Sequence, residues 1–505
     1  MWGMLLIHPP SAKPCEPPAG IARLAGALHA HGVPCRLLDA NLEGLLWLLE
    51  QPQAAADTWS RRALKNRPHH LAALREPATY RSPARYARAV SDLNRLLAVA
   101  GRDRGAVAGL ADYQQTRFSP LASADLLAAA EQPEQNPFHP WFSRRLPEVL
   151  EGVATVGFSL NYLSQAVCTF AMVGWLRQRF PGVTVVLGGG LVTSWLRRPD
   201  WRNPFSGLVD HLIAGEGEHP LLALGGAAPK QGESALPAYD PLPLADYLSP
   251  GLILPYSAAG GCWWNRCSFC PERAEGNPYR PAPLSRVRFE LRALTEKHRP
   301  ALIHLLDNAV SPALLRSLAD DPPGVPWYGF ARFDEHLADF SFCQALRRSG
   351  CVMLKLGLES GDQRVLDALQ KGIDLGTASR VLENLRRAGI AVYCYLLFGT
   401  PAEDEAAARR TLEFVVRHRE PIGFLNLALF NMPACGEEAG EYGTEPFYEG
   451  DLSLYTAFRH PLGWDRQRVR RFLDREFKRH PAVAAILRRD PPLFTSNHAP
   501  FFAAG

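Results

Sequence analysis

Three cysteines stand close together in the second half of the chain, where their thiols could hold a metal centre. Cys262, Cys267 and Cys270 lie in the string GGCWWNRCSFC with the spacing CxxxxCxxC, whereas the other seven of the ten cysteines are isolated. That cysteine content is far below the content of a secreted disulfide scaffold. On a cubane [4Fe–4S] cluster, three thiolates leave one iron open to a small molecule that carries amine and carboxylate groups. The spacing therefore indicates catalysis rather than electron transfer.

Two other kinds of site use cysteines at short spacing. A structural zinc ion takes four ligands in paired short motifs, and no fourth cysteine or histidine stands close to the cluster in the sequence. A thioredoxin-type redox pair needs a CxxC that opens a helix, and Cys267-Ser-Phe-Cys270 is instead followed by Pro271. Zinc or a degenerate site is the alternative to a catalytic cluster.

The elements that must position the cysteines form a regular alternation from residue 251 onward. Short apolar runs predict strands, and the segments between them have helical periodicity. Six parallel strands joined by five right-handed helical crossovers predict an incomplete (β/α) barrel, whose chemistry lies at the βα loops. The expected strands are 252–257, 302–306, 327–331, 352–358, 392–398 and 424–430, with helices over 285–298, 312–319, 336–349, 376–388 and 403–418.

The first part of the chain predicts a separate α/β domain. Apolar strands alternate with single helices there, which predicts a parallel, doubly wound, Rossmann-like sheet. Its strands are expected at 4–7, 35–39, 155–160, 183–187 and 207–214. A mainly helical insertion, rich in Ala, Leu and Arg, is expected over about 45–150. The expected organisation is a Rossmann-like domain at 1–225, a linker at 226–248, the partial barrel at 249–450 and a small helical C-terminal region at 451–505.

These residues resemble the radical S-adenosylmethionine (radical SAM) superfamily. Its hallmark is three cysteines after the first strand of a partial barrel, with an aromatic residue before the third, here Phe269. LGLESGDQRVLDALQKGI (356–373) resembles the fourth strand of the superfamily, and YLLFGTPAEDEAAARRTL (395–412) resembles the fifth. The usual spacing is CxxxCxxC, so the extra residue must bulge the loop. The sequence pattern CWW…CxFC resembles that of the branches that modify ribosomal peptides.

The resemblance implies which residues bind S-adenosylmethionine (SAM). Glu359 and Ser360 would face its ribose and amino-acid end, and Arg332 its carboxylate. Asp307 stands, without matching, where many members have Gly-Gly-Glu for the SAM amino group. Strand-end capping is the alternative role for these polar residues. The implied set is completed by Phe269 and by the adenine-region residues Gly399, Thr400, Pro401 and Asn426.

The first domain resembles that of the cobalamin-binding branch of the superfamily. The DxHxxG loop of cobalamin-binding Rossmann domains is absent, and HPPSAKPCEPPAG stands in its place; His8 lacks the motif around it. A glycine pair lets the backbone approach a bulky planar ligand. The alternative is a scaffold or substrate-docking domain without a cofactor. The implied cobalamin-binding residues are Ser159, Leu160, Gly188, Gly189, Gly215 and Glu216.

The resemblance implies a radical SAM enzyme with a [4Fe–4S] cluster, SAM and cobalamin as cofactors. An external one-electron reductant would drive cleavage of SAM to a 5′-deoxyadenosyl radical, which takes a hydrogen atom from the substrate. With cobalamin, the expected reaction is methylation of an unactivated carbon of a small-molecule or peptide substrate. The rival hypothesis is a corrinoid- or metal-binding regulator without turnover.

Composition and charge exclude several other classes of protein. An apolar content of 47% is that of an ordinary globular chain, and 55 Lys+Arg against 51 Asp+Glu leave a net charge of +4, which predicts no nucleic-acid partner. Apolar stretches such as Ala391–Phe398 fall short of the roughly 20 residues that span a bilayer. The amino terminus is expected to be a first strand rather than a targeting signal, and the protein to be cytoplasmic.

Overall fold

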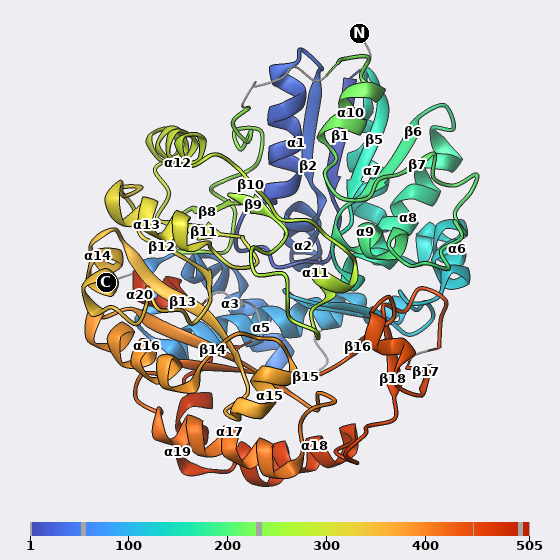
Figure 1. Ribbon diagram of the computed structural model, residues 1–505. Coiled ribbons are helices and arrows are strands. Elements are labelled where there is room, and N and C mark those ends of the chain that lie inside the picture. Colours follow the sequence, from blue (N-terminus) through green and yellow to red (C-terminus); the bar gives the residue numbers. More distant parts are fainter. Residues whose placement is uncertain (1–2, 52–56, 229–234, 448, 493–497, 504–505) are drawn as a thin grey trace. The chain divides into compact units, whose positions relative to one another are not determined.

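The chain folds into two compact units, seen in a computed structural model that describes residues 3–51, 57–228, 235–447, 449–492 and 498–503 (Figure 1). The first unit contains Met1–Leu252, Tyr448–Leu454 and Pro492–Ser496, and the second contains Ile253–Phe447, Tyr455–Pro491 and Asn497–Gly505. The chain thus leaves the first unit and returns to it twice. Parts of the expected insertion (52–56), linker (229–234) and C-terminal region (493–497) lie outside the described residues.

A five-stranded parallel sheet forms the centre of the first unit. Its order is β2-β1-β5-β6-β7, so β1 lies at the switch point of a doubly wound sheet, where ligands bind at the carboxyl ends of strands. This confirms the predicted α/β fold, although β7 is shorter than the expected 207–214. The strands are β1 (Gly3–His8), β2 (Cys35–Asp39), β5 (Val153–Ser159), β6 (Thr184–Gly188) and β7 (His211–Leu212), and the helices α1 (Ala19–Ala30), α8 (Leu163–Arg179), α9 (Gly190–Leu196) and α10 (Glu218–Leu224).

The segment between β2 and β5 is mainly helical, as expected. It also contains a hairpin, β3 (Ala106–Ala108) and β4 (Tyr113–Gln115), whose three-residue strands are too short to show alternation in the sequence. The helices are α2 (Ala40–Glu50), α3 (Thr58–Leu74), α4 (Pro77–Tyr80), α5 (Pro83–Gly101), α6 (Ser123–Glu131) and α7 (His139–Leu150), with 3₁₀ turns at Arg102–Arg104 and Pro133–Gln135.

A six-stranded parallel sheet forms the centre of the second unit, and all six predicted strands are present. Their order, β15-β14-β13-β12-β11-β8, follows the chain, as in a partial barrel. The carboxyl ends of parallel strands share one edge, so the residues that follow them gather there. The strands are β8 (Ile253–Tyr256), β11 (Leu302–Leu305), β12 (Trp327–Ala331), β13 (Cys351–Glu359), β14 (Ala391–Phe398) and β15 (Phe424–Leu429).

The helices of the second unit begin where a capping side chain meets an apolar stripe. Ser311, Asp339, Asp374 and Asp404 each accept a hydrogen bond from an amide in the first turn of the helix that follows. A short helix, α15 (Gln363–Ala368), is an addition to the predicted set. The others are α11 (Pro271–Ala274), α12 (Leu284–His298), α13 (Pro312–Asp320), α14 (Phe340–Arg348), α16 (Leu375–Ala388) and α17 (Glu405–Arg417); β9 (Ala259–Gly260) pairs with β10 (Arg280–Pro281).

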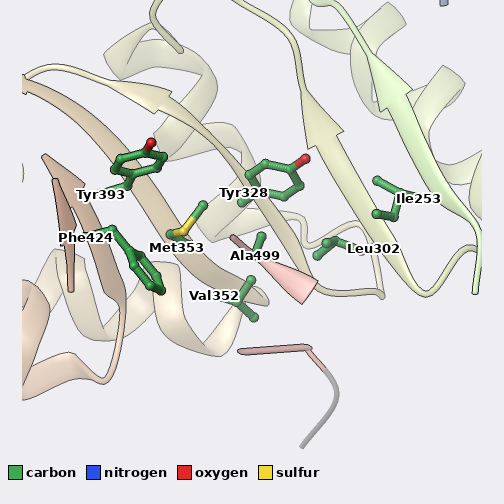
Figure 2. Packing of buried hydrophobic residues seen from close by; sticks show 8 residues of the cluster. All are labelled: Ile253, Leu302, Tyr328, Val352, Met353, Tyr393, Phe424 and Ala499. Carbon is green, nitrogen blue, oxygen red and sulfur yellow. The ribbon is translucent and has the colours of Figure 1, made fainter. Parts of the chain in front are cut away.

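The C-terminal part of the chain closes one side of the second sheet. Ala499 is fully buried against strand residues such as Val352 and Met353. Figure 2 shows the hydroxyls of Tyr328 and Tyr393 on the side turned away from Ala499. The expected helical content of this part is present as α18 (Arg466–Phe472) and α19 (Pro481–Leu487), and the short helix α20 (Pro500–Ala503) is an addition. This part also contains a π-helical turn at Leu473–Phe477 and contributes to a small sheet of β16 (Met432–Pro433), β17 (Thr444–Pro446) and β18 (Tyr455–Phe458).

Candidate active site

The three cysteines lie in the loop that follows β8, at the carboxyl edge of the six-stranded sheet. Cys267 is 8% exposed, while Cys262 and Cys270 are half-buried. Within the longer first spacing, Asn265 has a φ of 42°. Asparagine tolerates this left-handed conformation better than most residues, so it allows the loop to turn around the extra residue.

Trp264 fastens the cysteine loop to the turn that follows α15. Its Nε1 donates to the carbonyl of Gln370 at 3.0 Å. A Cβ built on Gly372, whose φ is +64°, would lie 2.1 Å from the Trp264 ring, so only glycine leaves room for it. The Ser268 amide donates to the Leu369 carbonyl at 3.1 Å and adds a second attachment. The sequence analysis missed this role, although the adjacent pair Trp263–Trp264 is an unusual signal for a loop.

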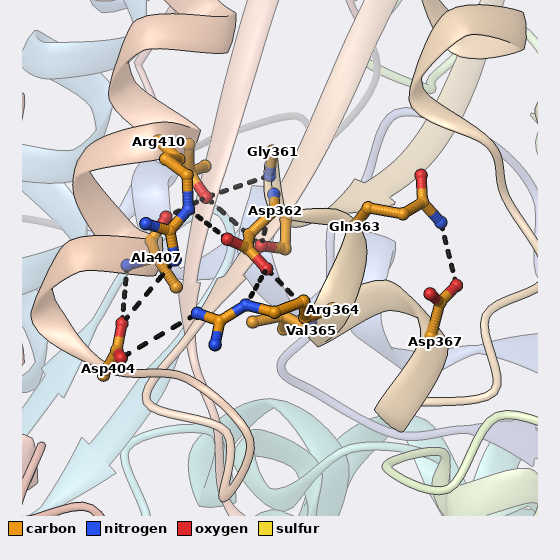
Figure 3. A network of polar contacts seen from close by, with 11 residues as sticks. Gly361, Asp362, Gln363, Arg364, Val365, Asp367, Asp404, Ala407 and Arg410 are labelled. Atoms are coloured by element: carbon orange, nitrogen blue, oxygen red, sulfur yellow. Dashed lines mark hydrogen bonds and ion pairs between the residues drawn. The ribbon is translucent and has the colours of Figure 1, made fainter.

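Helix α15 is itself held by a polar network, shown in Figure 3. Asp362 caps α15 by accepting from the Val365 amide and also pairs with Arg410 of α17. Burial alone would raise the pKa of Asp362, but these hydrogen bonds hold it below its usual value. The Gly361 amide donates to Thr411 Oγ1 at 2.9 Å. Through these contacts α17 positions α15, and α15 positions the cysteine loop.

Two cationic side chains lie at the cysteine loop. Arg332 follows β12, is 7% exposed, and places Nη1 3.9 Å from Cys267 Sγ. Lys371 forms a 2.7 Å ion pair with Glu359, and its Nζ lies 5.5 Å from the centre of the Phe269 ring. Arg332 thus holds a positive charge against one thiol, and Lys371 holds one against the aromatic residue before the third cysteine.

The thiols are close enough to influence one another. Burial raises the pKa of Cys270, and Cys267 and Cys262 raise it further. In the part of the chain that the structure describes, no three His, Cys, Asp or Glu side chains surround a point where a single metal ion could sit.

The donor set fits an iron–sulfur cluster. Trp263 Nε1 is buried without an acceptor among the described residues. A buried unpaired donor is costly, and a cluster sulfide or a bound ligand would satisfy it. Pro271 occupies the first turn of the four-residue helix α11, with Cys270 at its N-cap. The CxxC therefore does lead into a short helix, because proline is accepted at the first helical position.

Glu359 and Ser360 differ in what they present at the end of β13. Glu359 has a φ of 65°, and its carboxylate lies over Gly357, where an added Cβ would be 2.4 Å from Oε1. It thus faces Lys371 across the ion pair described above. Ser360 is fully buried, and its Oγ lies 3.2 Å from Thr411 Oγ1 and accepts from the Asp362 amide. That is the strand-end capping role.

Asp307 is also engaged by the chain. It is 2% exposed and accepts a hydrogen bond from the Ala258 amide at 3.1 Å, close to the start of the cysteine loop. Burial raises the pKa of Asp307 to about 6, against the effect of this amide. Its neighbour Asn308 bonds Glu272, which follows the third cysteine. The second strand end therefore supports both ends of the cysteine loop.

Of the predicted adenine-region residues, Gly399, Thr400 and Pro401 directly follow β14, and Asn426 lies in the neighbouring strand β15. Thr400 and Pro401 are buried, and Asn426 hydrogen-bonds Tyr393 in the strand layer. Gly399 has a φ of 80° and donates its amide to Glu403 Oε2 at 2.5 Å. It also lines a cavity of about 100 Å³, open to solvent, whose walls include Phe430, Phe447, Phe458, His460 and Arg466.

Glu403 is a residue that the sequence analysis missed. It is fully buried beside Gly399 and accepts from Trp464 Nε1 at 3.0 Å, while its Oε1 lacks a partner among the described residues. Burial raises its pKa to about 7. The signal available in the sequence was an acidic residue two positions after the Gly-Thr-Pro turn.

At the first sheet, Asn161 joins the ends of β5 and β6. Its Nδ2 donates to Ser159 Oγ and its Oδ1 accepts from the Gly190 amide. A Cβ on Gly189, whose φ is 105°, would lie 2.5 Å from the Leu160 carbonyl, so this glycine is required by the chain's own packing. Leu160 is fully buried.

At the carboxyl edge of the first sheet, other segments of the chain cover the ends of β1 and β2. Around β1, the buried Ser11 donates to the Gly109 carbonyl, and at β2 Asp39 accepts from Tyr247. Gly188 and Ser159 are half-buried, and Gly215 and Glu216 are exposed. A Cβ on Gly215 meets nothing within 4 Å. The carboxyl ends of β5, β6 and β7 are thus the open part of this edge.

The fold is that of a solved radical SAM methyltransferase. TsrM from Kitasatospora setae, determined with tryptophan substrate and a SAM analogue, matches 98% of this chain and 90% of its own, with a TM-score of 0.57 and 15% identity. TsrM with cobalamin and a [4Fe–4S] cluster bound matches with a TM-score of 0.53, over 97% of this chain and 91% of its own, at 15% identity. These matches confirm the predicted fold class of a Rossmann-like domain followed by a radical SAM barrel.

Curated proteins of similar sequence include two methyl-transferring enzymes. The bacteriochlorophyllide d C-12(1)-methyltransferase of Chlorobaculum tepidum is 26% identical over 33% of this chain and 38% of its own length. The hopanoid C-3 methylase of Methylococcus capsulatus is 25% identical over 48% of this chain and 52% of its own. The chain thus spans about half, or less, of the length of these relatives. No protein-family model matches it.

Proposed function

We propose that this protein is a cobalamin-dependent radical SAM enzyme that methylates an unactivated carbon of its substrate. The observation that carries the proposal is the set of three thiols in the loop after β8, at the carboxyl edge of the six-stranded sheet, with Arg332 against Cys267. The likeness to TsrM in fold and the methyl-transferring relatives support the same reaction class.

The protein's part in this chemistry is to hold the cysteines and to exclude solvent. When bound, a [4Fe–4S] cluster supplies the electron that cleaves SAM to methionine and a 5′-deoxyadenosyl radical. Cys262, Cys267 and Cys270 would ligate it, and the buried Trp263 N–H, which has no acceptor among the described residues, is a donor that a bound group could satisfy. Trp264 and Phe269 shield the loop, and α15 fixes its position.

The open strand ends of the first sheet are the proposed cobalamin site. When bound, cobalamin supplies the methyl group. Ser159, Gly188, Gly215 and Glu216 surround the part of the edge that the chain leaves uncovered. Asn161 fixes the β5 and β6 ends relative to each other, which keeps this edge rigid.

Anaerobic reconstitution tests the radical chemistry. With iron, sulfide, SAM and dithionite, the full chain is expected to turn brown and to form 5′-deoxyadenosine. Cys267→Ala should abolish the product, while Cys35→Ala, in β2 of the other unit, should retain it. A chain that binds iron but forms no 5′-deoxyadenosine would favour the regulator hypothesis.

Cobalamin binding is tested by two glycines of matched geometry. Gly215 and Gly226 both have a φ of +72° and open space around an added Cβ. A Trp at position 215 would project from the proposed site and should weaken hydroxocobalamin binding about tenfold or more, whereas Gly226→Trp should leave it unchanged. Equal affinities, measured by absorbance titration, would contradict the placement, and absence of corrinoid from the wild type would contradict methylation while leaving radical chemistry standing.

A further inference from the structure

Arg332 makes more contacts with the cysteine loop than a ligand-binding side chain needs. Nη1 lies 3.9 Å from Cys267 Sγ, and Nη2 donates to the Lys371 carbonyl. Its guanidinium lies 4.3 Å from the centre of the Trp264 ring and 5.7 Å from that of Trp263. It therefore links the end of β12 to both the loop and the turn after α15.

These contacts leave little of the guanidinium for a SAM carboxylate. Both terminal nitrogens already donate to the chain, and a ring covers one face. Burial lowers the pKa of Arg332, while the nearby Cys267 and Cys262 raise it. An arginine stays charged under such conditions, so a fixed positive charge lies against the thiols.

We propose that Arg332 is a positioning residue of the three-cysteine loop whose charge also favours the reduced state of the bound cluster. This inference rests on the proposed function. Reduction adds one electron from the external reductant, so the reduced centre is one charge more negative. A cation held in a poorly solvated site lowers the free energy of that state more than that of the oxidised one.

The test compares Arg332→Gln and Arg332→Lys with Arg266→Gln. Arg266 contacts the same Trp264 ring at 5.1 Å but is exposed, so solvent screens its charge. Each variant is reconstituted anaerobically, its iron and sulfide are counted, and its midpoint potential is measured by electron paramagnetic resonance in a poised titration. SAM affinity is measured on the same samples by equilibrium binding.

Arg332→Gln is expected to have a more negative midpoint potential. At a fixed potential, its reduced fraction should be lower than that of the wild type by about threefold or more. Arg332→Lys, which keeps the charge, should lie closer to the wild type in potential but lose iron faster, because an ammonium cannot span both ends of the link. Arg266→Gln should match the wild type. SAM affinity should change less than about threefold in all three.

The alternatives give different results. An unchanged potential in a cluster-loaded Arg332→Gln overturns the inference and leaves the proposed function intact. A loss of SAM affinity of about tenfold without a potential shift also overturns it and assigns Arg332 to the SAM carboxylate. If Arg332→Gln retains no cluster, the midpoint potential of Arg332→Lys decides the question instead. Because lysine keeps the charge, a midpoint potential far below that of the wild type would contradict the role given to the charge. A wild-type chain that binds no cluster overturns the proposed function itself.

Discussion

Gly372 is a single backbone position that decides where Trp264 can lie. Its positive φ and its contact with the indole ring both require glycine. Gly372→Ala should cost about 1–3 kcal/mol in the docking of the loop, because the ring must move. We expect a lower iron content per chain after reconstitution and gel filtration.

Gly324→Ala is the matched control for that substitution. Gly324 has a φ of +79°, but nothing lies within 4 Å of an added Cβ. It carries the backbone penalty without the clash. Equal iron contents in the two variants would contradict the role given to the Trp264 contact.

Glu403 should make stability depend on pH. Its pKa is about 7 in the folded chain against an ordinary glutamate pKa of 4.5, so between these pH values the folded state holds a proton that the unfolded state has lost. The free energy of unfolding should therefore fall as pH rises from about 4.5 to 7, by up to about 3 kcal/mol. Chemical denaturation at pH 5.5 and 8 measures the difference.

Glu403→Gln should flatten this pH dependence and be more stable than the wild type at pH 8. The amide oxygen can still accept from the Gly399 amide and from Trp464. Asp307, with a pKa of about 6, contributes a remaining slope of the same sign at lower pH. An unchanged slope in Glu403→Gln would show that other groups carry the effect.

At the scale of single residues, the sequence could indicate which side chains belong to the site but not which other residues they contact. The three cysteines and Phe269 are recognisable by spacing. The links that hold them, such as Lys371 with Glu359 and Trp264 on Gly372, join positions whose proximity only the folded chain creates. Ser360 illustrates the same point: its position in the motif gave no sign that its hydroxyl meets Thr411, 51 residues further along the chain.

Helix α6 depends on a cap from a distant part of the chain. Its own N-cap residue, Ala122, has no side-chain atom that can accept a hydrogen bond. The Ser123 amide and hydroxyl donate instead to the two carboxylate oxygens of Asp451, at 2.7 and 2.6 Å. Asp451→Ala should destabilise the first unit by about 1 kcal/mol, because the helix loses both the acceptor and a favourable negative charge. Thermal melting measures the change, and Glu449→Ala, an exposed neighbour, serves as the control.

At the scale of elements, length and local signals decide what could be predicted. The parallel strands are continuous apolar runs, and helices such as α13 and α16 start at Ser311 or Asp374 with clear amphipathic stripes. The short elements were not predicted. Each strand of the hairpin β3–β4 and of the sheet β16–β18–β17, and the helix α15, consists of two to six residues. Segments this short have no period to detect, and tertiary contacts stabilise them.

At the scale of the whole molecule, the C-terminal residues complete the second unit. His498 and Ala499 are almost fully buried, and Ala499 packs against the strand core. A chain that ends at residue 497 should therefore lose about 2–4 kcal/mol of stability in the second unit. In calorimetry, only the transition of that unit should move, whereas Asp451→Ala should move only the other. A common shift of both transitions would show that the units unfold together.

Within the residues that the structure describes, no helix combines the length and apolarity needed to cross a bilayer. The likeness in fold to TsrM covers 98% of this chain. The return of the chain to the first unit carried no sequence signal, because a seven-residue segment such as Tyr448–Leu454 has no pattern of its own.

That return has a consequence for how the protein is made. Asp451 leaves the ribosome about 200 residues after the main part of the first unit ends at Leu252, a delay of about 10–40 s at elongation rates of about 5–20 residues per second. During this interval the first turn of α6 lacks its acceptor. The first unit therefore reaches its final form only after most of the second unit has been synthesised, and the nascent chain must stay free of misassembly until then.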